Sequence, residues 1–172
     1  MLQAGMENIF DTFASPLIGL PVRHIWQGYS SAIFLEFGEL RPRLEQDGSA
    51  SQSEGQMGLM IERSWRIEDC TSIRCGSSSD EALWPDVFAL LLGSEVRYVK
   101  TFGRLPEIEI GLSNGMHILS FMTAEGLPTW TLFDRCSPDE RWLSFEQEGF
   151  TVDGRSRPTA ALFHKRHQKF SP

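Results

Sequence analysis

The stretch "LLGSEVRYV" (residues 91–99) decides the fold, because it repeats an earlier stretch, "LIGLPVRHI" (residues 17–25). The two share Leu, Gly, Val and Arg in the same order and at the same spacing. Four further pairs follow in the same order: "AIFLEFG" (32–38) with "EIEIGLS" (107–113), "GLMI" (58–61) with "GMHI" (115–118), "SWRIED" (64–69) with "TWTLFD" (129–134), and "SIRCG" (72–76) with "RWLSFEQEG" (141–149). The spacing between pairs differs only in loops, where a repeated unit tolerates insertions. The sequence therefore predicts two similar units, 17–76 and 91–150.

Each unit is expected to consist of short antiparallel strands. Residues 22–27 and 32–37 are separated by a short polar turn, which is typical of a β-hairpin. In the second segment Ile33 and Leu35 share one face, and Glu36 points to the other. A unit of four short strands buries one face only and needs a partner layer, so we expect the two units to cover each other.

Two helical segments are expected beside the strands. Apolar residues recur at helical spacing over residues 2–14, and the period changes again near residues 80–92. Ser78 and Glu81 fit a capping box, and Pro85 should split or kink the second helix. The predicted fold class is α+β: two similar antiparallel β units, as a sandwich or β-roll, with a short N-terminal helix and a central helix near 80–92.

The chain is expected to form a single domain, 1–172, which ends in a basic tail, 154–172. Its hydrophobic fraction is 41%, with 12 Phe and 5 Trp, which is enough to fill a core. Trp65 and Trp130 lie in apolar strands, so both should be buried. The polar, Gly- and Ser-rich segment 38–56 is expected to be a mobile loop.

The charge of the chain is unevenly distributed. The formal net charge of −7 is the balance of −12 over residues 1–153 and +5 over residues 154–172. An acidic body repels phosphate, which disfavours nucleic acid as a partner. The sequence shows no signal peptide in "MLQAGMENIF" and no apolar run long enough to span a membrane, and it has three cysteines, an odd number. These features favour a cytoplasmic protein.

The order Gly-x-x-Val, alternating apolar strand, Asn-Gly turn and Trp-x-Leu resembles small bacterial proteins of unknown function, some of which are similar to immunity proteins of toxin systems. The resemblance covers most of the chain. Its motifs are short and structural, so it implies a fold and a binding role but carries no catalytic residue over to this sequence.

Few residues indicate metal or catalytic chemistry. Cys70 and Cys75 are separated by four residues and His164 and His167 by two, but a zinc site made from all four would need to join a strand to the tail. Buried small thiols and a solvated tail explain the same residues, so no metal and no cofactor is predicted. The sequence contains none of the common hydrolase, phosphate-loop, zinc-protease or dinucleotide motifs, which favours a protein without enzymatic activity.

The first functional hypothesis is a non-catalytic intracellular binding protein, similar to an immunity protein, that engages a basic protein partner through an acidic surface. Glu36, Glu107 and Glu109 are the candidate partner-binding residues, because the strand pattern turns them away from the apolar face. A homodimer is an alternative partner arrangement. Charge complementarity would speed the encounter with a basic partner.

The second hypothesis is a small-molecule-binding protein or an enzyme. Its pocket would lie between the two halves and be lined by Trp26, His117 or Trp142. A deep cleft with converging polar groups would favour this hypothesis, and a broad acidic surface would favour the first.

Overall fold

The computed structural model describes residues 9–44 and 47–156. In chain order its elements are helical residues 9–14, η1 (Ser15–Leu17), β1 (Val22–Gln27), β2 (Ile33–Phe37), β3 (Met57–Ile61), β4 (Trp65–Glu68), β5 (Ile73–Gly76), η2 (Glu81–Leu83), α2 (Trp84–Leu91), β6 (Val96–Phe102), β7 (Glu107–Leu112), β8 (His117–Ser120), β9 (Trp130–Asp134), β10 (Asp139–Glu146) and β11 (Gly149–Ser156). Within the described residues, no helix has the length and apolar character needed to traverse a lipid bilayer.

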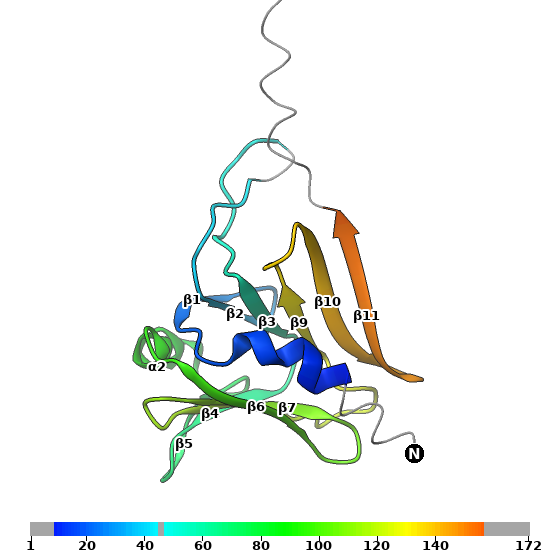
Figure 1. Cartoon of the computed structure of the whole chain (residues 1–172). Coiled ribbons are helices and arrows are strands. Elements are labelled where there is room, and N and C mark those ends of the chain that lie inside the picture. Colours follow the sequence, from blue (N-terminus) through cyan, green and yellow to red (C-terminus); the bar gives the residue numbers. More distant parts are fainter. Residues whose placement is uncertain (1–8, 45–46, 157–172) are drawn as a thin grey trace, which may run out of the picture.

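The strands form two antiparallel sheets, which confirms an α+β fold dominated by strands. One sheet has six strands in the order β1-β2-β3-β9-β10-β11, and the other has five in the order β5-β4-β8-β7-β6. Figure 1 shows the six-stranded sheet above the five-stranded one. The apolar side chains of both sheets meet in one buried cluster between them.

Each sheet contains strands from both halves of the chain, so the expectation that each unit forms its own layer is wrong. The hairpin strands β1–β3 continue through β9 and β10, and β6–β8 continue through β4 and β5. Pairing β3 with β9 removes an open strand edge and widens the apolar face that can be buried. The two halves are therefore interlocked and do not simply stack on each other.

Trp65 and Trp130 anchor the core, as the sequence predicts. Their side chains are 0% and 1% exposed. The indole Nε1 of Trp65 donates to the carbonyl of Ser31 at 2.6 Å, and that of Trp130 donates to the carbonyl of Pro106 at 2.8 Å. Both large side chains are thus buried without leaving their N–H donor unpaired.

The helices close the space between the sheets. Helical residues 9–14 lie between the two layers on one side of the molecule, and α2 lies at another side (Figure 1). Phe10 packs edge-on against Trp130 with ring centroids 5.9 Å apart, and Trp84 packs edge-on against Trp65 at 4.9 Å. The N-terminal helical residues thus contribute Phe10 to Trp130, and α2 contributes Trp84 and Phe88 to Trp65.

The start of α2 differs from the sequence expectation. The N-cap of η2, which leads into α2, is Asp80, whose side chain accepts a hydrogen bond from the backbone N–H of Ala82, so the capping box expected of Ser78 is wrong. Pro85 lies in the first turn of α2 and divides it from η2. At this position the missing proline N–H removes no helical hydrogen bond. Gly93, with φ +80°, follows the end of the helix.

The chain beyond residue 150 also differs from expectation. Residues 149–156 form β11, which pairs with β10 along its whole length, so the start of the expected basic tail belongs to the sheet. The rest of that tail lies outside the described residues, as do residues 2–8 of the expected N-terminal helix. In the loop 38–56, Arg41 and Glu54 bond to each other through their backbones.

Candidate binding face of the six-stranded sheet

One face of the six-stranded sheet packs on the core, and the opposite face carries a row of large apolar side chains. The core side is formed by Ile33, Leu35, Leu59, Leu132 and Leu143, which are 0–1% exposed. Side chains at the alternate positions point outward. We call the following outward set the aromatic face: Trp26 on β1, Phe34 on β2, Met60 on β3, Phe133 on β9 and Trp142 on β10. All five remain partly exposed.

Cross-strand pairing brings these side chains together. Trp26 pairs with Phe34 across β1 and β2, and the two rings stack at a centroid distance of 4.0 Å with planes 3° apart. Phe34 pairs in turn with Met60, and Phe133 pairs with Trp142. The aromatic face is thus one band that crosses five neighbouring strands.

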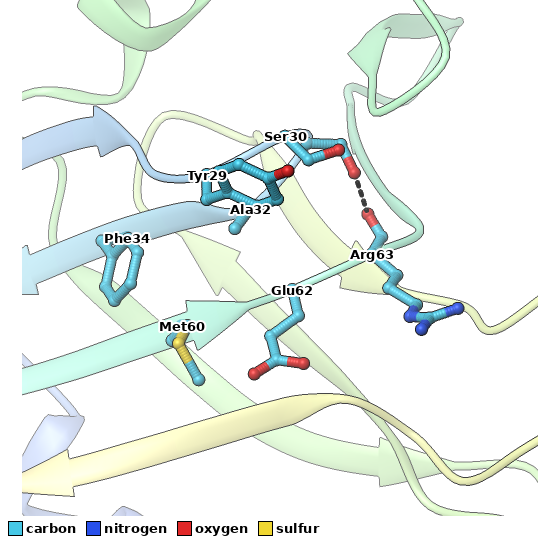
Figure 2. Close-up of a pocket in the computed structure, with 8 residues that line it drawn as sticks. Tyr29, Ser30, Ala32, Phe34, Met60, Glu62 and Arg63 are labelled. Carbon is cyan, nitrogen blue, oxygen red and sulfur yellow. Dashed lines mark hydrogen bonds between the residues drawn. The ribbon is translucent and has the colours of Figure 1, made fainter.

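The aromatic face is hollowed in two places. A hollow of about 590 Å³ is lined by Phe34, Met60 and the β1–β2 turn. Figure 2 shows Phe34, Met60 and Glu62 around this hollow, with Tyr29 above them on the turn. A second hollow, of about 320 Å³, lies on the other side of Met60 and is lined by Phe133 and Trp142. Such shallow hollows in an apolar surface can accept the side chains of a partner.

A buried charge cluster supports one end of the aromatic face. Arg135, 5% exposed, donates from Nη1 to Glu36 Oε2 and from Nε to Glu140 Oε1, each at 2.9 Å. Its guanidinium group also lies over the Phe133 ring, 4.9 Å from the centroid. A Cβ atom at Gly58 would lie 2.7 Å from Nη1 of Arg135, so glycine leaves the room that the guanidinium group occupies.

The two carboxylates of this cluster respond differently to burial. Burial raises the pKa of Glu36, and the opposing attraction of Arg135 does not cancel it. Burial also disfavours the charge on Glu140, but hydrogen bonds from Arg135 and Arg155 outweigh it and hold the pKa of Glu140 below its usual value. Arg135 is shared among Glu36, Glu140 and Glu54, whose Oε2 lies 3.7 Å from Nε of Arg135, whereas Glu140 is also paired with Arg155.

The structure contradicts the expectation that Glu36 is an exposed acid. Its side chain does point away from the core, but the residue is only 3% exposed and its charge is paired with Arg135. Strand alternation predicted the direction of this side chain correctly. It could not predict that Arg135 covers Glu36, because Arg135 directly follows β9 and is 99 residues away in the sequence.

Glu107 does not present a free carboxylate either. Its Oε2 accepts a hydrogen bond from Ser120 Oγ at 2.5 Å, and its Oε1 accepts one from the backbone N–H of Met122 at 2.6 Å. The carboxylate joins β7 to the end of β8 on the five-stranded sheet. It is therefore half-buried in an internal contact.

Glu109 belongs to a hydrogen-bonded cluster on β6–β8. The Tyr98 hydroxyl donates to Glu109 Oε1 at 2.5 Å, so its oxygen accepts from His117 Nδ1 at 2.8 Å. Lys100 Nζ lies 3.1 Å from the same carboxylate. Burial and the neighbouring Glu109 raise the pKa of Tyr98 to about 12. Burial opposes the charge of Glu109, but hydrogen bonds from Tyr98 and Lys100 hold its pKa below the usual value.

This cluster can orient His117, but it does not lie beside Trp26 or Trp142, the other residues expected to line a pocket. The hydrogen bond through Nδ1 leaves Nε2 of a neutral His117 as an acceptor. His117 lies on β8 in the five-stranded sheet, whereas Trp26 and Trp142 lie in the other sheet. Those two tryptophans are four strand positions apart, which corresponds to roughly 19 Å. The structure therefore does not bring these three residues together in one pocket.

The sequence contains a signal for the aromatic face in its strand segments. The segments "IFLEF" (33–37), "MGLMI" (57–61) and "WTLF" (130–133) carry large apolar residues at both odd and even positions. A strand that is apolar on both sides is expected to be covered on both sides. Only the strand order, however, shows that the second sides of these three strands form one surface.

Across the described residues, no three side chains of the metal-ligating types come together. The chain matches no protein-family model, and comparisons with curated proteins and with solved structures find no similar protein.

Proposed function

We propose that the protein is a non-catalytic binding protein and that a protein partner docks on the aromatic face. The observation that carries the proposal is the band of five partly exposed aromatic and methionine side chains, hollowed on both sides of Met60. Trp, Phe, Met and Arg are enriched at the centres of protein interfaces, where they contribute most of the binding energy. Arg155, with a side chain 61% exposed, lies at the rim of the second hollow.

The partner is a protein of net positive charge. The −12 charge on residues 1–153 attracts such a partner over distance and speeds the encounter, and the aromatic face supplies the buried contact. A protein that captures a basic partner in the manner of an immunity protein fits both features. The exposed thiols of Cys70 and Cys136 support a reducing, cytoplasmic setting.

We also propose that the two halves of the chain arose by duplication. Reciprocal hydrogen bonds support this: the N–H of Gly19 donates to the carbonyl of Val96, and that of Gly93 to Val22, both at 2.8 Å. The hairpins β1–β2 and β6–β7 have a register shift at the same place, directly after Val22 and Val96. Under this proposal residue 59 corresponds to residue 118, because these residues pair with the corresponding residues 35 and 110. The sequence comparison of 58–61 with 115–118 instead matches residue 61 with 118, which differs by two residues.

Duplication followed by divergence explains why only one sheet carries an aromatic face. Glu36 pairs with Gly58 on the six-stranded sheet, and Gly111 pairs with His117 at the corresponding place on the five-stranded sheet. There the ring of Tyr98 lies over Gly111, and the Tyr98 hydroxyl belongs to the hydrogen-bonded cluster with Glu109 and His117. One copy has thus become a docking surface and the other a hydrogen-bonded surface.

Substitution of Trp142 tests the docking proposal. Partners are captured by cross-linking in the source cells with the wild-type protein, and binding is then measured with purified components by calorimetry. Trp142→Ala should weaken binding roughly 30-fold, which corresponds to about 2 kcal/mol at an interface hot spot. The matched control is Leu105→Ala, which truncates a side chain 48% exposed in the β6–β7 turn and should change binding less than about twofold.

Two results would contradict the proposal. If both variants bind the captured partner as tightly as the wild type, the aromatic face is not the docking surface. If cross-linking captures no protein, the function is not that of a protein-binding module. Thermal melts of both variants show whether a loss of binding reflects a loss of fold.

A further inference from the structure

A cavity of about 350 Å³ lies between β1 and α2, next to the end of the aromatic face. Its lining residues are His24, Ile25, Trp26, Gln27, Glu81, Trp84, Pro85, Phe88, Ala89 and Leu92. Most of this lining is apolar, and three of the residues have aromatic rings from Trp or Phe. Its volume lies at the lower end of the range for small-molecule pockets.

Two residues that line this cavity, Trp26 and Trp84, each carry an indole donor without a partner in the described part of the chain. Among the described residues, the Nε1 atoms of Trp26 and Trp84 are buried and make no hydrogen bond. Trp84 as a whole is only 2% exposed. The two core tryptophans, Trp65 and Trp130, do have carbonyl partners for their Nε1 atoms. A buried donor without an acceptor is unfavourable and is rare in folded proteins.

We propose that this cavity binds a small, neutral ligand that has an apolar body and a carbonyl oxygen. The carbonyl accepts hydrogen bonds from the indole N–H groups of Trp26 and Trp84, and the apolar body packs against Phe88 and Leu92. An indole N–H is a donor only, so the complementary group on the ligand must be an acceptor.

The charges around the cavity favour a neutral acceptor over an anionic one. Glu81 is exposed and lines the cavity, so its carboxylate repels a carboxylate or phosphate ligand. His24 is engaged elsewhere, because its Nε2 lies 2.8 Å from Gln52 Oε1 and donates to it. Among the residues that the structure describes, no arginine or lysine lines the cavity. The fitting ligand class is thus aromatic or alkyl amides and ketones.

The inference goes beyond the docking proposal, because it concerns a different ligand class and a different cavity. The two share one residue, Trp26, whose ring stacks on Phe34 of the aromatic face. Trp84 belongs to the cavity alone. Loss of ligand binding in Trp84→Phe and loss of partner binding in Trp142→Ala are therefore separate results.

The test uses the indole N–H signals of the five tryptophans in a ¹H–¹⁵N NMR spectrum of the ¹⁵N-labelled full chain. Trp26→Phe and Trp84→Phe each remove one signal and so assign it. The probes are benzamide, which carries a neutral carbonyl, ethylbenzene, which lacks an acceptor, and benzoate, which is anionic. A fragment as small as benzamide is expected to bind with a Kd on the order of 1 mM.

Benzamide should move the Trp26 and Trp84 signals downfield, as expected when a free N–H gains an acceptor, and leave those of Trp65 and Trp130 in place. Benzoate should bind at least about tenfold more weakly because of Glu81. Trp84→Phe keeps an aromatic ring but removes the N–H, and should weaken benzamide binding about three- to tenfold. Trp142→Phe, on the aromatic face, is the matched control and should leave benzamide binding unchanged.

Three results would overturn the inference. The first is an absence of shifts in the Trp26 and Trp84 signals at about 20 mM benzamide, well above the expected Kd. The second is an equal downfield shift with ethylbenzene, since that ligand offers no acceptor. The third is a uniform shift of all five indole signals, which would indicate nonspecific binding. If a Trp→Phe variant fails to fold, ¹⁵N-edited NOE spectra of the wild-type protein assign that indole signal, and the wild-type titration then decides the question.

Discussion

Replacing Arg135 by Met should destabilise the protein by about 3–5 kcal/mol at pH 8, the range for breaking a buried ion pair. Arg135 and Glu36 are 5% and 3% exposed, and their Nη1 and Oε2 atoms are 2.9 Å apart. Methionine keeps the apolar part of the side chain but leaves the Glu36 carboxylate without its cation. Of the other two acids beside Arg135, Glu140 retains Arg155 at 2.8 Å and Glu54 retains Arg43 at 2.9 Å, so both charges stay compensated. Most of the loss therefore falls on Glu36.

The destabilisation caused by Arg135→Met should decrease as the pH falls. Burial already raises the pKa of Glu36, and removal of Arg135 raises it further. When the folded pKa lies above the unfolded one, the penalty applies above the folded pKa and disappears below the unfolded value of 4.5. Towards pH 5 the charge penalty on Glu36 therefore decreases, and the destabilisation approaches that of the lost hydrogen bonds alone, about 1 kcal/mol. The lowered pKa of Glu140 acts in the same direction. The pairing of Glu140 with Arg135 stabilises the wild type only while Glu140 is charged, so this part of the destabilisation also decreases as the pH falls.

Urea denaturation at pH 5 and pH 8 measures this difference, provided that the m-value is unchanged. Adding Glu36→Gln to Arg135→Met should restore at least about 1 kcal/mol at pH 8, because no buried charge remains unpaired at that position. Arg97→Met is the matched control: Arg97 lies 3.6 Å from Glu95, their side chains are 63% and 51% exposed, and its loss should change stability by under about 0.5 kcal/mol. A loss for Arg135→Met below about 1 kcal/mol at pH 8, or an equal loss at both pH values, would refute the reasoning.

Three further predictions concern the core, the polar cluster and the long loop. Trp65→Ala should reduce the free energy of unfolding by about 3–5 kcal/mol, and a near-wild-type denaturation midpoint would contradict its role as an anchor. In a Tyr29→Phe background, the absorbance of Tyr98 should titrate near pH 12, and the stability linked to its raised pKa should be lost as the pH rises from about 10 to 12. Adding Glu109→Gln should lower that midpoint, and a midpoint near 10 in a protein still folded by circular dichroism would be inconsistent with the cluster. Limited proteolysis should make its first internal cut within 38–56, because ordering this polar segment buries little apolar surface, and a first internal cut within 57–150 would argue against a mobile loop.

The sequence by itself determined the local elements. The alternation in 32–37 predicted a strand and the direction of each side chain, and Asn114-Gly115 predicted the turn between β7 and β8, where Gly115 has φ +81°. Trp65 was predicted to be buried for the same reason. These features depend on residues close together in the chain, so their pattern is visible in the sequence.

β11 was missed because its pattern is weak. Residues 149–156 include Asp153, Arg155 and the 46%-exposed Val152, and lack the regular apolar alternation of a half-buried strand. The strand is held by pairing with β10, whose edge would otherwise be open. That pairing is a property of the assembled sheet.

Only the tertiary structure decided which strands are neighbours, and the candidate site depends on that choice. β3 pairs with β9 across about half of the chain, and this pairing alone joins Met60 to Phe133 and Trp142 in one surface. The same long-range assembly covers Glu36 with Arg135 and places His117 on the other sheet. Periodicity tells which face of its own strand a side chain occupies. Whether that face meets water, a counter-charge or another apolar strand depends on register between distant segments, which no local pattern encodes.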